Sequence, residues 1–281
     1  MYILKNNLNY KTMKAITKLL VFSVVLLYTT VISGQEQLTV PLSSPGKSFS
    51  LNVSLLNGSI NVTTYSGNEI TIETKSSSEN ESAPAEKNGM RRIAKPAGYE
   101  IVATENNNEV VINNNNFNSS VNLNIKIPQQ DVRLNLTTVN DGDIVVSNAK
   151  GEMEINNVNG SIQLENVTGS VVASTISGDV KVNFVSVNPN AAMAFSTLSG
   201  DIDLTLPAMI NVNLKLKSDM GEMYSDFDLS VEQSNSNPIV TQENGMRKVE
   251  KSNWVVAKIN KGGPEYLLKN MTGSIYIRKG K

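Results

Sequence analysis

The chain has 281 residues, a formal net charge of −1, and neither histidine nor cysteine. A charge so close to zero provides no field that would attract nucleic acid or an anionic membrane. Without histidine and cysteine, the chain cannot build a histidine-based catalytic triad, a cysteine–histidine pair or an ordinary zinc site. It also has no disulfides, so packing and backbone hydrogen bonds must hold the fold.

The N-terminal segment has the order of a secretory signal peptide. An uncharged apolar core, "LLVFSVVLLYTTVIS" (19–33), is followed by Ser33-Gly34 and the polar "QEQ". The basic patch before this core consists of Lys11, Lys14 and Lys18. We therefore predict a signal peptide over residues 1–34, with Met13 as an alternative start and an uncleaved anchor as the competing interpretation. Export to the periplasm, the cell surface or the medium follows, with no membrane span after cleavage.

Residues 35–281 are predicted to form a single, nearly all-β domain. In "VNLNIKI" (121–127) and "VNLKLK" (212–217), apolar and polar residues alternate. This period of two is typical of half-buried strands, and windows with the helical period are almost absent.

Two segments, about 75–98 and 232–253, are polar, charged and contain proline, so we expect mobile loops there. They contain similar six-residue segments, "NGMRRI" (88–93) and "NGMRKV" (244–249). This similarity either predicts that each loop ends in a related basic strand start, or reflects chance in a biased composition. Arg91, Arg92 and Lys95 form a basic cluster in the first loop. It would either bind an acidic partner or phosphate-bearing glycan, or be an ordinary solvated charge cluster.

Glycine recurs every nine residues in the centre of the chain, at Gly142, Gly151, Gly160, Gly169 and Gly178. Apolar residues stand two before, two after and four after each of the last four glycines. The pattern predicts short strands joined at glycine turns, with all three apolar positions facing the core. Later glycine spacings, 22 residues to Gly200 and 21 more to Gly221, are close to two such units.

These spacings favour a parallel β-solenoid with coils of about 18–22 residues, each made of two short strands. An antiparallel β-meander or sandwich, with hairpins at the "NG" and "SG" turns, is the alternative. In the solenoid, Asn157 should lie beneath Thr175 and Asn148 beneath Asn166, forming a side-chain ladder.

Several whole segments resemble one bacterial family. They are "TTVNDGDIVV", "NVNGSIQLENVTGSVVASTISGDVKV", "MAFSTLSGDIDLTLP", "LKLKSDMGEMYSDFD" and "KINKGGPEYLLKNMTGSIYIRK". Together they are similar to the DUF4097 family of envelope proteins, which bears an adhesin label, over about Leu38 to Lys279. The resemblance implies an exported β-solenoid-like domain and carries no catalytic residues. Asp141 departs from the pattern as an extra residue before Gly142.

We predict no catalytic, cofactor-binding or metal-binding residues. Asp143, Asp179, Asp201 and Asp203 lie near turn glycines, but they are too sparse for a calcium-binding β-roll. A polysaccharide lyase or hydrolase with a shallow acidic site, using Lys181, Asp179 and Asp201, is the enzymatic alternative. Trp254 is expected at the end of the stack rather than against a sugar. The prediction is therefore a non-enzymatic adhesin or envelope scaffold that presents a polar face and binds an envelope protein or a surface glycan.

Overall fold

A computed structural model describes residues 37–76, 86–87, 90–91, 100–115, 119–232, 239–243, 246–250 and 254–281. A compact unit spans Glu36–Lys281. The predicted signal peptide, Arg92, Lys95 and most of the two predicted loops lie outside the described residues. No helix among the described residues is long and apolar enough to cross a membrane.

The described secondary structure is a series of short strands. The first twelve are β1 (Gln37–Pro41), β2 (Phe49–Asn57), β3 (Ile60–Tyr65), β4 (Glu69–Ser76), β5 (Glu86–Lys87), β6 (Met90–Arg91), β7 (Ile101–Asn106), β8 (Glu109–Asn114), β9 (Val121–Pro128), β10 (Asp131–Asn140), β11 (Ile144–Ser147) and β12 (Lys150–Asn157). The others are β13 (Ile162–Ser174), β14 (Val180–Val187), β15 (Met193–Ser196), β16 (Ile202–Leu206), β17 (Val212–Ser218), β18 (Met223–Ser225), β19 (Leu229–Glu232), β20 (Ile239–Glu243), β21 (Met246–Glu250), β22 (Val255–Ile259), β23 (Glu265–Asn270) and β24 (Ile275–Lys279).

The strands form a parallel β-solenoid, as predicted. Ile144 pairs with Ile162, Ile162 with Val180, and Val180 with Ile202, so successive coils are 18, 18 and 22 residues long. Each coil contributes one strand to each of two faces. Face A contains β8, β2, β10, β12, the second half of β13, β15, β23 and β17, and face B contains β9, β3, β11, the first half of β13, β14, β16, β24 and β18. Parallel pairing rules out the meander for these coils.

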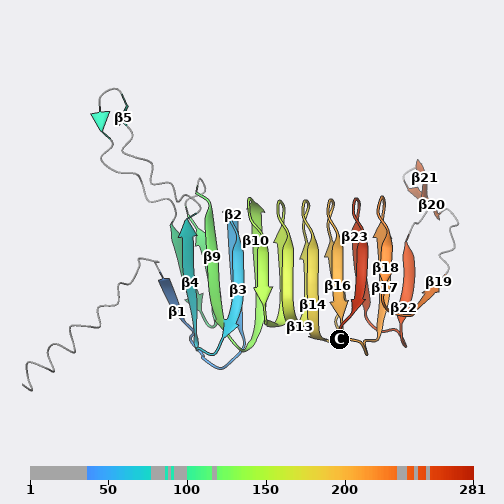
Figure 1. Ribbon diagram of the computed structural model, residues 1–281, viewed down its shortest axis with the longest axis horizontal. Coiled ribbons are helices and arrows are strands. Elements are labelled where there is room, and N and C mark those ends of the chain that lie inside the picture. The colour runs from blue at the N-terminus through green and yellow to red at the C-terminus, as the bar shows by residue number, and fades with distance from the viewer. Residues whose placement is uncertain are drawn as a thin grey trace, which may run out of the picture. The chain divides into compact units, whose positions relative to one another are not determined.

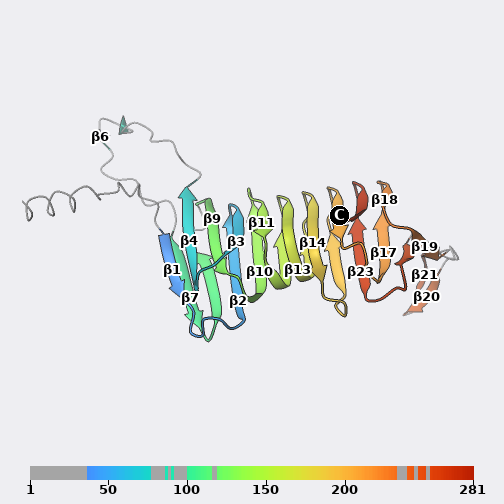
Figure 2. The same ribbon diagram turned by 60° about the horizontal axis from the view of Figure 1, so that its bottom comes forward.

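The order of the coils in the stack differs from their order in the chain. The β2–β3 coil lies between the coils β8–β9 and β10–β11. At the other end, the C-terminal β23–β24 coil lies between β15–β16 and β17–β18, and the red β23 is seen beside the orange β17 (Figures 1 and 2). Each inserted coil is hydrogen-bonded on both sides, which protects chain segments that would otherwise fray.

Antiparallel strands occur at the two ends of the stack. At one end β7 pairs with β8 on face A, while β4 pairs with β9 and then with β1 on face B. At the other end β22 pairs antiparallel with β17, and β19 with β22. The echoed "NGMR" segments each begin a short hairpin strand, because β6 pairs with β5 and β21 with β20.

The core lies between the two faces and consists of aligned Val, Ile and Leu side chains. The positions two and four residues after each repeat glycine are buried, as predicted; Ile162 and Leu164 are examples. The position two residues before glycine behaves differently. Ala149 and Val167 are buried there, whereas Ile176 is 49% exposed. The prediction that all three positions face the core is therefore wrong at the turns that lead from face A to face B.

Glycine is required at the A-to-B turns because adjacent coils touch through their backbones. A Cβ atom at Gly160 would lie 2.1 Å from the carbonyl oxygen of Gly142, and the φ angle of Gly160 is 145°. Neither the contact nor the angle is compatible with a side chain. At the B-to-A turns, the predicted corner glycine Gly169 instead lies inside β13, which bends there with a shift of register between Leu164 and Thr168.

The predicted ladder exists in part. Asn157 and Thr175 do occupy neighbouring coils, but their side chains donate to backbone carbonyls, those of Gly142 and Gly160, at 2.9 Å. Thr138 and Thr197 do the same with Gly58 and Gly178. A true side-chain amide ladder forms just before the glycines, where Asn159 donates to Asn140 and Asn140 to Asn57; Asn140 is two residues before Gly142 because of the extra Asp141. Asn148 and Asn166 have a different role, since both adopt left-handed backbone conformations with φ of 61° and 53°.

Candidate binding groove on face A

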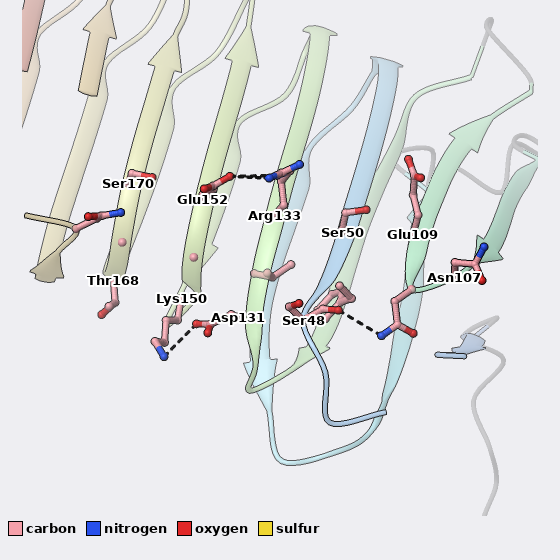
Figure 3. Close-up of a pocket in the computed structure, with 16 residues that line it drawn as sticks. Ser48, Ser50, Asn107, Glu109, Asp131, Arg133, Lys150, Glu152, Thr168 and Ser170 are labelled. Carbon is pink, nitrogen blue, oxygen red and sulfur yellow. Dashed lines mark hydrogen bonds and ion pairs between the residues drawn. The ribbon is translucent and has the colours of Figure 1, made fainter. Parts of the chain in front are cut away.

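A groove of about 670 Å³ crosses the outer side of face A, where the strands begin. Two rows of side chains from β8, β2, β10, β12 and β13, and from the segments just before these strands, line it (Figure 3). One row contains Glu109, Ser50, Arg133, Glu152 and Ser170. The other contains Asn107, Ser48, Asp131, Lys150 and Thr168. Every side chain in these two rows carries a hydroxyl, amide or charged group.

Two ion pairs of opposite orientation cross the groove between β10 and β12. Asp131 is in register with Lys150, and the carboxylate lies 3.0 Å from the ammonium nitrogen. Two residues further on, Arg133 is in register with Glu152 and also lies 3.0 Å from it (Figure 3). All four side chains are at least 60% exposed. Exposed pairs contribute at most about 1 kcal/mol, so their donors and acceptors can exchange partners with a ligand.

The hollow exists because two glycines form part of its floor. Gly151 and Gly169 are paired in register on β12 and β13, between the two rows of side chains. A Cβ at Gly169 would lie 2.0 Å from the carbonyl oxygen of Gly151, so the floor must stay bare. A ligand in the groove would meet polypeptide backbone there.

The end of the groove near β8 is a turn held by a carboxylate. Asn107 and Asn108 both have positive φ angles, 53° and 63°. Glu105 accepts hydrogen bonds from the backbone amides of Ser43 and Asn108 and from the Ser43 hydroxyl, at 2.9 to 3.0 Å. These bonds, the Ser43 amide first, lower the pKa of Glu105. The Asn108 side chain in turn donates to the carbonyls of Ser44 and Ser48, which ties the turn to the segment before β2.

A second hollow of about 400 Å³ continues from the groove across β10, β12 and β13. It shares Arg133, Glu152 and Ser170 with the groove and adds, among others, Asn52, Asn135 and Glu154. The polar surface therefore extends along the strands beyond the groove itself.

The aspartates singled out in the sequence act as backbone acceptors. Asp143, Asp179 and Asp201 each accept a hydrogen bond, of 2.7 or 2.8 Å, from a backbone amide of the next coil, namely those of Ser161, Asp201 and Ser274. Their carboxylates thus join neighbouring coils at the turns. In the part of the chain that the structure describes, no three acidic residues cluster in a way that could hold a metal ion.

The other predicted residues lie away from the groove. Asp203 is on the outer side of face B, in register with Lys181 and paired with Arg278 at 2.7 Å. Trp254 immediately precedes β22 at the C-terminal end of the stack, with the Lys215 ammonium 5.1 Å from its ring centre. Arg91 belongs to β6, and the rest of its basic cluster is outside the described residues.

Sequence reasoning missed the four charged groove residues. The signal was their spacing, because Asp131 and Lys150, and likewise Arg133 and Glu152, stand 19 residues apart. That interval is one 18-residue coil plus the extra residue Asp141, which adopts a left-handed conformation with φ of 54°. Opposite charges one coil apart must lie side by side on a parallel stack.

Comparison with known proteins gives the family of the chain. Residues 7–253 match the model of the family described as Toastrack DUF4097. The chain belongs to this family. No curated protein matches the chain. A solved structure from Clostridium sporogenes, described as a "putative cell adhesion protein", is similar over 88% of this chain and 99% of its own, with 15% identity and a TM-score of 0.45. The resemblance to DUF4097 seen in the sequence is thus confirmed.

Proposed function

We propose that this Toastrack protein is an exported, non-enzymatic, adhesin-like protein that binds a surface glycan in the groove on face A. The observation that carries the proposal is the alternation of charge in that groove. Asp131, Lys150, Arg133 and Glu152 place donors and acceptors side by side with no net charge. A sugar, whose hydroxyl groups both donate and accept, matches such a surface better than an ion of either sign.

The shape of the groove supports an extended ligand. Its volume of about 670 Å³ lies within the range of small-molecule sites, roughly 300–1,000 Å³. The second hollow prolongs the polar surface toward Glu154 and Asn135. A chain of several sugar units could therefore lie across the strands, with hydroxyls facing Ser50 and Ser170.

The arrangement of the carboxylates favours binding over catalysis. Hydrolysis of a glycosidic bond requires one carboxylic acid that can donate a proton and a second carboxylate that activates a water molecule or acts as the nucleophile. In the groove, the carboxylates of Asp131 and Glu152 each lie 3.0 Å from a basic side chain, so both are already engaged in an ion pair. The polysaccharide lyase or hydrolase is therefore the alternative that the experiment must test.

The test is a glycan array probed with the purified full chain, followed by titration of the best ligand. We expect the double variant Arg133→Ala/Glu152→Ala to weaken binding about tenfold or more, because it removes charged hydrogen-bonding partners. Asp203→Ala/Arg278→Ala is the matched control, since it removes an exposed ion pair from face B. Absence of any bound glycan, or an equal loss of affinity in the two double variants, would refute the proposal that a glycan binds in the groove. Release of shortened glycan would instead show that the protein is a polysaccharide lyase or hydrolase.

A further inference from the structure

The centre of the outer side of face A carries an apolar patch, which meets the second hollow at Val172. The patch consists of one aliphatic or small residue on each of the neighbouring strands β13, β15 and β23 and one just after each strand: Val172, Ile176, Ala194, Leu198, Leu267 and Met271. Val172, Ile176, Leu198 and Met271 are 45% to 50% exposed. Ser174 and Ser196 stand between them on β13 and β15, and the exposed Lys269 on β23. Contiguous exposed aliphatic side chains of this kind mark interaction surfaces.

The charges beside the patch differ between its two sides. On the β12 side lie Glu152 and Glu154, and on the β17 side lie Lys215 and Lys217. Lys217 is in register with Lys269 of β23, and its ammonium is paired with Asp219 at 3.2 Å. An acidic surface would complement the β17 side of the patch.

The register of the strands makes this surface self-complementary. One row across five neighbouring strands reads Glu154, Val172, Ala194, Leu267, Lys215. A two-fold rotation about an axis along β15 reverses the row. It then places Glu154 of each copy over Lys215 of the other, Val172 over Leu267, and Ala194 over Ala194. A rotation about the stack axis would instead place like charges over each other.

We propose that the patch is the contact surface of a symmetric dimer, with two copies of this chain packed face to face about β15. An isologous contact of this kind is the commonest way in which proteins pair. The small side chains of Ala194 and Ser196 at the axis allow two flat sheets to approach to the usual distance of about 10 Å. The Glu154–Lys215 contacts fix the antiparallel orientation of the two stacks.

The area of the contact predicts a weak, reversible dimer. Five strands spaced by about 4.8 Å, and five residues of about 3.3 Å each, define about 400 Å² of flat face per copy. Stable interfaces bury about 800 Å² of accessible surface per partner. Pairing is therefore expected to be weak and reversible. It would cover Glu154 of the second hollow and leave uncovered the starts of the strands, which carry Ser48, Asp131 and Lys150.

The absence of cysteine from the chain provides a direct test by cross-linking. In the full chain, Ala194→Cys places one thiol on the axis, next to its copy in the partner. Asn183→Cys is the control, because Asn183 is exposed on β14 of face B. Because facing sheets about 10 Å apart hold the two Cα atoms beyond disulfide reach, a short bis-maleimide cross-linker is used. At about 50 µM protein we expect Ala194→Cys to form linked dimer at least about tenfold faster than the control. Equal rates would overturn the proposal.

Charge exchange tests the orientation independently of the cysteine. Glu154→Lys and Lys215→Glu should each lower the dimer population measured by sedimentation velocity at least about fivefold, whereas the double exchange restores it. Both positions are on the outer side of the sheet, so the variants keep the core intact, which circular dichroism verifies. A monomer at every concentration, or a double variant as weak as the single ones, would refute the dimer.

Discussion

The two turns of each coil have similar sequences but opposite surroundings. At the A-to-B turn, Asn157 and Thr175 are buried, and the next residues, Val158 and Ile176, point outward. At the B-to-A turn, Asn166 is left-handed and the next residue, Val167, is completely buried. The left-handed Asn166 changes the direction of the backbone. It thereby shifts by one residue the alternation between side chains that face the core and side chains that face outward. Identical patterns of apolar residues can therefore build the core at one turn and a surface ridge at the other.

Substitution of a glycine in the A-to-B turn should have the largest effect on stability. Gly160→Val should lower the free energy of unfolding by about 3 kcal/mol or more, since it combines backbone strain with a clash against Gly142. Urea denaturation measures the loss. Gly46→Val is the control, because Gly46 also has a positive φ, 86°, but no atom lies within 4 Å of its Cβ position. A similar loss at both glycines would show that stacking contact is irrelevant.

Shortening the side chain two residues before glycine should cost stability at the B-to-A turn but not at the A-to-B turn. We expect Val167→Ala to cost about 2 kcal/mol, because it leaves a cavity in the core, and Ile176→Ala less than about 0.5 kcal/mol. The same denaturation experiment provides both values in dilute protein. Equal costs would mean that the two positions share one environment.

Glycine substitutions of the two asparagines should sharpen the contrast. Asn166→Gly should stay within about 0.5 kcal/mol of the parent, because glycine adopts the left-handed conformation readily. Asn157→Gly should cost about 2 kcal/mol, since it removes the side-chain bond to the Gly142 carbonyl in a buried site. If the order of the two were reversed in thermal melts, the roles assigned to these residues would be wrong.

The smallest effect concerns a left-handed turn held by charge, Asn107–Asn108. The pKa of Glu105 lies below its ordinary value of 4.5, so its stabilising bonds are fully present above pH 4.5 and are lost as the pH falls through the lower, folded-state pKa. The amide resonance of Asn108 should accordingly titrate in acid, below about pH 4.5. In Glu105→Gln this titration should be absent, and its persistence would point to another group.

Much of the fold could be predicted because its determinants are local and repeat. Gly142, Gly160 and Gly178 are 18 residues apart, which sets the coil length directly. The insertion of β2–β3 and β23–β24 one coil inward could not be predicted, because it depends on pairing between residues as distant as Ile202 and Ile275.

The groove escaped prediction for a related reason. Arg133 and Glu152 are unremarkable surface residues in the sequence, and only the 19-residue coil brings them together. The aspartates after the glycines looked like a site because carboxylates often bind ligands. Asp179 instead accepts the backbone amide of Asp201, a role that becomes visible only when the coils are stacked.

Thiol labelling tests the difference between the turns most directly. Because the chain has no cysteine, single cysteines can replace Ala149 and Val167, which are buried two residues before glycine, and Leu56 and Ile176, which are exposed there. In dilute native protein, the cysteines at positions 56 and 176 should react with a thiol reagent at least about a hundredfold faster than those at 149 and 167. Equal rates at the four positions would contradict the opposite facing of the two turns.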